Sequence, residues 1–241
     1  GFVLILLPTV VLIFGLNFLD QYTWLRTSPE LSAALQLTGT IMVVTGGIWA
    51  AFQNHLGRLM GYAVIIETGF SLLALSPGNG TSYIIFSTLF LPGLMGLFTA
   101  TMALAVISKN GQSLRLQDSR ELIRTYPVAS VAFLASIVSL AGMPLLAGFP
   151  VHLAVFEEIS QVSLGLSFWA LLGSLGLLVG ALRCFMIFTS GGLSGKASFS
   201  EKPGEIILLT SGIFLLILVG LFPQIFLPQM SKLISAFQHL V

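Results

Sequence analysis

Four titratable side chains stand in or beside apolar segments of this sequence and could take part in proton transfer. They are Glu67, His152, Glu157 and Arg183. A carboxyl group and an imidazole can each take up and release a proton, and a guanidinium beside a carboxyl group favours its charged form. At the centre of a bilayer a lone charge costs about 3 kcal/mol or more, so such a group is neutral, paired or hydrated. These residues are therefore candidates for a proton path.

Glu67 and His152 are the strongest of these candidates. Glu67 stands about ten residues into the apolar segment 56–76, roughly 15 Å deep in a membrane-spanning helix. It is either a relay carboxylate or a neutral acid hydrogen-bonded to a neighbouring helix. His152 can pass a proton through its two ring nitrogens, or it can stay neutral and cap carbonyl groups that a nearby helix break leaves unpaired.

Glu157 and Arg183 are more ambiguous. Glu157 follows His152 by five residues, which is about 7.5 Å along a helix and over 100° around it, so water or another helix would have to join them. Glu157 and Glu158 point in different directions, so at most one faces a given neighbour, and both could instead lie at the membrane interface. Arg183 either extends its side chain to the interface or forms an ion pair with a carboxylate such as Glu157.

A helix break is predicted next to His152. Gly142, Pro144, Gly148 and Pro150 occur within nine residues between two apolar segments. Proline removes a backbone donor and blocks helix continuation, and glycine weakens a helix. In hydrocarbon such a break is tolerated only inside protein or along a wet cavity. The sequence therefore predicts a discontinuous region at residues 142–150, beside a functional site.

The composition predicts an all-α, polytopic membrane helix bundle. Of the 241 residues, 56% are hydrophobic and only 8% are charged, whereas soluble domains carry about 25% charged residues. The net charge of +1 gives no reason to expect binding to nucleic acid.

The sequence contains no ligand set for a metal or a redox cofactor. Cys184 is the single cysteine, which excludes a disulfide framework or a cysteine cluster. His55, His152 and His239 are too scattered for metal-ligand spacing. A Gly-rich phosphate loop and a Ser-His-Asp arrangement are also missing, so we assign no catalytic residue, no metal site and no cofactor to this chain.

About eight transmembrane helices are predicted within a single transmembrane domain, residues 1–241. The apolar segments are 1–19, 31–52, 56–76, 82–107, 126–141, 151–163, 167–189 and 205–222. The charged segment 109–125 is expected to lie partly on the membrane surface, and 223–241 is predicted to be an amphipathic tail.

The predicted helix count also assigns the basic residues to two sides. If all eight segments cross, Arg58, Lys109 and the arginines of 112–125 share one side, which the positive-inside rule places in the cytoplasm. Arg26, Lys196 and Lys202 then lie on the other side.

Four stretches resemble antiporter-like membrane subunits of respiratory complex I (NADH:quinone oxidoreductase), their hydrogenase relatives and Mrp-type cation/proton antiporters. They are residues 55–76, 139–156 (S-L-A-G-M-P-L-L-A-G-F-P-V-H-L-A-V-F), 169–188 and 218–223 (L-V-G-L-F-P). The second stretch is the most specific. The resemblance implies that the chain is the C-terminal half of a longer subunit, as a start on Gly1 inside an apolar run also suggests.

The departures from the family pattern concern its buried basic residues. Where the family carries lysines, this chain has Leu7-Pro8-Thr9, Gly57 and, after the break, His152. Glu67 replaces a histidine, and segment 82–107 lacks the family's histidine and lysine. The resemblance therefore implies either a rewired proton path through Glu67, His152 and Glu157 or a chain that has lost transport.

The functional expectation is a membrane-arm, antiporter-like subunit of a complex I-type proton-translocating quinone oxidoreductase or a related energy-converting complex. Electron transfer to quinone would belong to the assembly, whose other membrane subunits are the expected partners within an energy-coupling membrane such as the cell inner membrane. One alternative is a component of a Mrp-type antiporter or ion-uptake system. Another is a non-transporting structural or adaptor subunit.

Overall fold

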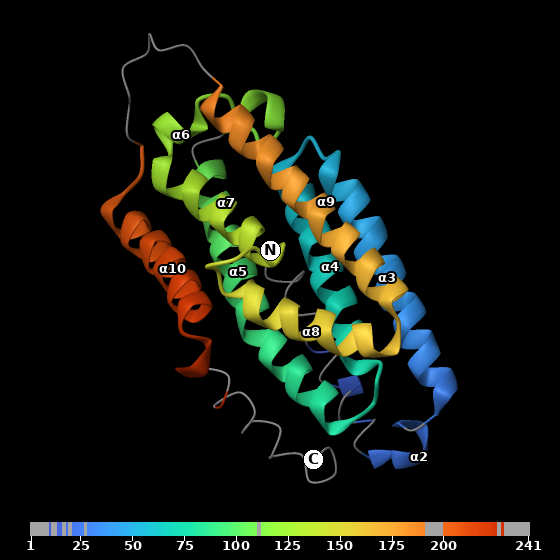
Figure 1. Cartoon of the computed structure of the whole chain (residues 1–241). Coiled ribbons are helices and arrows are strands. Elements are labelled where there is room, and N and C mark those ends of the chain that lie inside the picture. The colour runs from blue at the N-terminus through green and yellow to red at the C-terminus, as the bar shows by residue number, and fades with distance from the viewer. Residues whose placement is uncertain are drawn as a thin grey trace.

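The computed structural model describes residues 28–109, 112–190 and 200–225, together with 10, 14, 15, 18, 21–26 and 228. Within these residues the secondary structure is helical, in a bundle of roughly parallel rods (Figure 1). The helices are α2 (Thr23–Arg26), α3 (Pro29–Ala51), α4 (Leu56–Leu75), α5 (Gly80–Ser108), the 3-10 turn η1 (Leu116–Asp118), α6 (Leu122–Thr125), α7 (Pro127–Leu140), α8 (Gly148–Val162), α9 (Leu164–Thr189) and α10 (Pro203–Leu221). Most of the predicted first span 1–19 and tail 223–241, with Lys196 and His239, lies outside the described residues.

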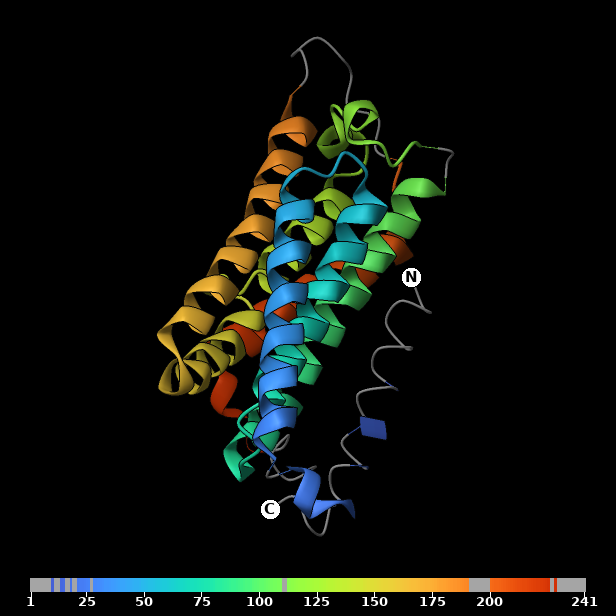
Figure 2. The same cartoon turned by 90° about the vertical axis from the view of Figure 1, so that its right-hand side faces the viewer.

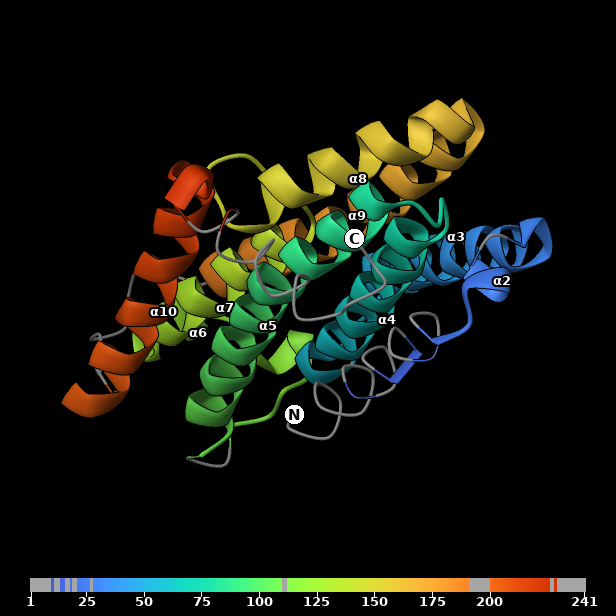
Figure 3. The ribbon, with the colours of Figure 1, turned by 90° about the horizontal axis from the view of Figure 1, so that it is seen from below.

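Five of the described helices, α3, α4, α5, α9 and α10, are long and apolar enough to cross a membrane. They confirm an all-α polytopic membrane bundle. Figure 3 shows the bundle from below, with α10 at one edge beside α5 and α7 and with α3 toward the other.

Glycines allow close contacts between α3 and its neighbours α4 and α9 (Figure 2). A Cβ on Gly47 of α3 would overlap the carbonyl oxygen of Gly173 on α9, and one on Gly39 would lie 2.9 Å from Gly69 O on α4. Lipid tails are as apolar as leucine, so helices in a membrane associate through such close packing of small residues.

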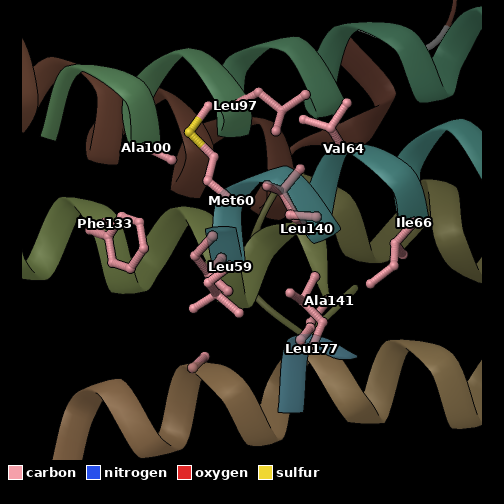
Figure 4. Packing of buried hydrophobic residues seen from close by; sticks show 14 of the residues in the cluster. Leu59, Met60, Val64, Ile66, Leu97, Ala100, Phe133, Leu140, Ala141 and Leu177 are labelled. Carbon is pink, nitrogen blue, oxygen red and sulfur yellow. The ribbon is translucent and has the colours of Figure 1, made fainter. Parts of the chain in front are cut away.

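The core lies among α4, α5, α7 and α9, and it brings the middle of α4 close to the end of α7. Figure 4 shows Leu59 and Met60 of α4, Leu97 of α5 and Leu140 of α7 in this cluster, all of them buried. This packing fixes the depth of the break that follows Leu140.

Helices α7 and α8 together make one interrupted crossing. They contain 14 and 15 residues, about 21 and 22 Å of helix, which is less than the roughly 30 Å of a hydrocarbon core. In Figure 1, α7 descends from the end near α6 to about mid-height, and α8 continues obliquely toward the end where α9 begins. The predictions that residues 126–141 and 151–163 cross separately are wrong for this reason.

The interrupted crossing also corrects the predicted side of Lys202. With α7 and α8 counted once, the chain enters α10 at the end where it leaves α5. Lys109 Nζ lies 2.7 Å from Glu205 Oε1, and Ser200 N donates to Thr125 O at 3.2 Å. Lys202 therefore lies on the same side as Lys109.

The N-terminus of α7 is capped by a residue that lies far along the chain. Tyr126, which precedes α7, contributes no side-chain cap. Instead, the Glu201 carboxylate accepts hydrogen bonds from Val128 N at 3.3 Å and Ala129 N at 2.7 Å. A carboxylate at this position satisfies unpaired N–H groups and interacts favourably with the helix dipole.

Candidate proton-transfer site

Glu67 and His152 face each other in the interior of the bundle. Glu67 Oε1 lies 3.7 Å from His152 Nε2, and the two residues are 8% and 2% exposed. This separation is too long for a hydrogen bond. Neither atom has a hydrogen-bond partner among the described residues. Two groups that the sequence predicts as separate relay candidates are therefore a buried pair.

The end of α7 leaves room for the imidazole. Gly142 has φ +73°, its N–H donates to Ser139 O at 2.9 Å, and Met143 N donates to Val138 O at 3.2 Å. These two bonds form a Schellman motif, which favours glycine because an L side chain is strained at positive φ. A Cβ on Gly142 would also lie 3.1 Å from the Cβ and Cγ of His152.

The start of α8 sets the protonation of the ring. Gly148 N donates to Ser139 Oγ at 3.2 Å, and a Cβ on Gly148 would overlap Ser139 O. One turn later, His152 Nδ1 lies 2.8 Å from Gly148 O. A carbonyl oxygen only accepts, so Nδ1 carries a proton. Nε2, which faces Glu67, is therefore the nitrogen that can accept a proton in the neutral ring.

The break is shorter than the sequence predicts. Residues 141–147 are non-helical, and α8 already begins at Gly148. Pro150 falls in the first turn of α8, where the missing N–H costs no intrahelical bond. The predicted C-terminal limit of the break at Pro150 is therefore wrong by one turn. Pro144 lies within the non-helical residues, and Leu145 has φ +73°.

Apolar groups enclose the pair. The rings of Phe70 and His152 meet edge to face, with centroids 4.5 Å apart, and Phe156 packs against Phe70 at 5.7 Å. A Cβ on Gly93 of α5 would lie 3.0 Å from Glu67 Oε2. Sequence reasoning missed the roles of Phe70 and Gly93, although Gly93 directly follows the proline inside α5, a signal that could have drawn attention to it.

Glu157 and Arg183 lie away from the pair and from each other. Glu157 is exposed on α8. The Arg183 guanidinium donates to Ala51 O at 2.5 Å and Gln53 O at 3.3 Å, and also to Asn54 Oδ1 at 2.8 Å. Arg183 thus caps the C-terminal end of α3, and no Arg183–Glu157 ion pair forms.

Of the two adjacent glutamates, Glu158 has the defined contact. Its Oε1 accepts a hydrogen bond from Asn79 Nδ2 at 2.9 Å. Asn79 is also the N-cap of α5, where it accepts from Ser82 N at 2.7 Å. Glu158 therefore stabilises the junction of α5 and α8 at the end of the bundle opposite Arg183. Over the described ranges no group of three or more His, Cys, Asp or Glu side chains could hold a metal ion.

Residues 2–175 match the family described as NADH:quinone oxidoreductase/Mrp antiporter, transmembrane. The NADH-quinone oxidoreductase subunit N of Deinococcus radiodurans is 25% identical over 210 residues, which cover 83% of this chain and 42% of that protein. Subunit N of Rhodopseudomonas palustris is 27% identical over 136 residues, which cover 55% of this chain and 28% of that protein. The chain thus spans less than half the length of these curated relatives.

Two solved structures share the fold. A chain of respiratory complex I from Thermus thermophilus aligns with a TM-score of 0.63 and 28% identity, covering 84% of this chain and 46% of that one. A chain of the Mrp complex from Dietzia sp. aligns with a TM-score of 0.77 and 14% identity, covering 87% and 49%. The second likeness concerns the fold alone.

Proposed function

The chain belongs to the NADH:quinone oxidoreductase/Mrp antiporter transmembrane family, and on that premise we propose that it is part of a proton-moving subunit in which Glu67 and His152 share one proton. The observation that carries this proposal is the buried approach of Glu67 Oε1 to His152 Nε2, with neither atom otherwise hydrogen-bonded among the described residues. Unsatisfied polar atoms are costly inside a protein. A water molecule in this gap, or a closer approach of the two side chains, would let the pair share a proton and would remove the cost.

The charge of the pair sets how many protons it holds. With one shared proton the pair is either a carboxylic acid beside a neutral imidazole or a carboxylate beside an imidazolium, and both forms have zero net charge. Removing that proton leaves a buried carboxylate, and adding a second leaves a buried imidazolium. Each of these states carries a net charge in an apolar site and is therefore unfavourable. The number of protons bound to the pair therefore responds to charges that move elsewhere in the protein.

We place this chain in a complex I-type quinone oxidoreductase, with other membrane subunits as its partners. Both relatives named above are called NADH-quinone oxidoreductase subunit N. The identity to the Thermus thermophilus complex I chain, 28%, is twice that to the Mrp chain, 14%. Electron transfer belongs to other subunits in this proposal, and this chain carries no cofactor.

The basic end of the bundle is proposed to face the cytoplasm. The helix ends and connections at this end carry the basic residues Arg58, Lys109, Arg115, Arg120, Arg124, Arg183 and Lys202. Cytoplasmic loops of membrane proteins carry an excess of lysine and arginine. Lys202 also lies on this side, and its positive charge strengthens the assignment.

The test is proton movement by the intact complex in membrane vesicles. We expect Glu67→Gln and His152→Ala to lower the number of protons moved per electron while the complex still assembles and reduces quinone. Glu157→Gln, on the same helix as His152 but exposed, is the matched control and should pump like the parent. If both site variants assemble and pump normally, the relay is refuted and a scaffold role takes its place.

A further inference from the structure

A polar cavity of about 330 Å³ lies at the basic end, away from Glu67 and His152. The polar residues that line it are Gln53, Asn54, His55, Arg58, Arg115 and Gln117. No carboxylate is among them. We propose that this cavity binds the phosphate group of an anionic phospholipid of the cytoplasmic leaflet.

Backbone bonds join the two segments that carry the cavity's arginines. Arg58 stands in the first turn of α4, and Arg115 lies in the segment between α5 and α6. A short antiparallel bridge joins His55 to Arg115, with Leu56 N donating to Leu114 O at 2.9 Å and Leu116 N donating to Asn54 O at 2.8 Å. The two segments are therefore fixed relative to each other although they come from distant parts of the sequence.

The groups around the cavity are suited to an anion. Within the described part of the chain, the guanidinium groups of Arg58 and Arg115 have no hydrogen-bond or ion-pair partner. His55 Nδ1 accepts a hydrogen bond from Gly57 N at 3.2 Å, so the neutral ring carries its proton on Nε2 and can donate there. Arginine forks match the geometry of phosphate oxygens. Arg183, bonded to Asn54 and Gln53, adds a third positive charge behind the wall.

A lipid fits better than a free phosphate ion because an apolar stripe leads into the cavity. Leu37, Ile41, Ile48 and Phe52 recur at spacings of four and seven residues along α3 and its C-cap, which places them on one helix face. All four are exposed, and Phe52, 71% exposed, also lines the cavity. Trp49, also exposed one turn below Phe52, is a side chain typical of the membrane interface. A phosphate in the cavity would let an acyl chain lie along this stripe.

The charge of the lipid follows from the same geometry. Two unpaired guanidinium groups without a carboxylate favour a headgroup of net negative charge over a zwitterionic one. Anionic lipids are concentrated in the cytoplasmic leaflet, and basic pockets between transmembrane helices on that side bind their headgroups.

The experiment is native mass spectrometry of the purified complex after exchange into vesicles of phosphatidylglycerol or of phosphatidylcholine. We expect retained phosphatidylglycerol on the parent, about tenfold weaker retention for Arg58→Gln or Arg115→Gln, and a larger loss for the double variant. Arg120→Gln, an exposed arginine at the same end that does not line the cavity, is the control and should retain lipid like the parent. Arg58→Lys keeps the charge without the fork and should fall between parent and Arg58→Gln.

Three results would overturn the proposal. The first is a double variant that retains phosphatidylglycerol as tightly as the parent, or an Arg120→Gln control that loses as much phosphatidylglycerol as the double variant. The second is displacement of the lipid from the parent by excess inorganic phosphate, together with equally weakened phosphate binding in both arginine variants. This result would make the cavity a site for free anions. The third is a carboxylate of a neighbouring subunit bound to Arg58 or Arg115 in the assembled complex.

Discussion

Gly142→Ala should disturb both the helix break and the proton pair. The residue has φ +73°, a conformation that costs an L-residue about 1–2 kcal/mol. The new methyl group would also lie 3.1 Å from two atoms of His152, so the imidazole would have to move by a few tenths of an ångström. Alanine also lowers the conformational entropy of the unfolded chain, which stabilises the folded state by roughly 0.5 kcal/mol. The difference is a backbone destabilisation of about 0.5–1.5 kcal/mol, to which the displaced imidazole adds, and we expect fewer protons moved per electron.

Labelling of Cys184 measures the stability change. It is the single cysteine of the sequence and is 2% exposed, so a maleimide reaches it only when the helices open. Labelling during a detergent denaturation series, read by mass spectrometry of this chain, gives the free energy of opening. Gly61→Ala is the matched control, because Gly61 lies inside α4 with no neighbouring atom within 4 Å of an added Cβ. This control should be neutral or up to about 1 kcal/mol more stable. A Gly142→Ala chain as stable as the parent, with normal pumping, would refute the roles assigned to Gly142.

Two further substitutions test the contacts that hold the helix ends. Arg183→Gln removes charged donors from the carbonyls of Ala51 and Gln53 and should lower the free energy of opening by about 1.5–3 kcal/mol. Arg183→Lys should restore only part of this loss, because an ammonium group cannot span both carbonyls and Asn54. An unchanged Cys184 labelling midpoint would contradict the capping role. Glu201→Ala should lower the stability of the first turn of α7 by about 1 kcal/mol, because it leaves N–H groups there unpaired. The change should be seen as faster hydrogen exchange in that turn. Exchange as slow as in the parent would show that the cap is dispensable.

The sequence predicts the chemistry of Glu67 and His152 individually but does not predict their pairing. Depth in an apolar segment and proximity to a helix break are local properties, and each can be read from spacing. The pair forms because α4 approaches α8. This approach depends on the packing of Leu140, on the close contact of Gly148 with Ser139, and on the left-handed conformation of Gly142. These are tertiary contacts that no local pattern contains.

The errors in the predicted topology have a similar cause. A segment of about fifteen apolar residues fits either a short crossing or half of an interrupted one, and length alone does not separate the two. The partner of Arg183 was also beyond local reasoning, because main-chain carbonyls, present at every position, carry no signal in the sequence. The fold class, by contrast, follows directly from a composition that could not cover a surface facing water.

The cap that Glu201 places on α7 has a consequence for the order in which the molecule is made. A growing chain completes α7 and α8 long before it reaches residue 201, so the interrupted crossing first inserts with unpaired N–H groups at its entry. Only when α9 has brought the chain back to the same side of the membrane does the Glu201 carboxylate become available, and Lys109 can then bind Glu205. The last described helix thus packs on α5 and α7, and a chain that ended before it would keep both members of the proton pair but lose the contacts that hold α5 and the first half of the interrupted crossing.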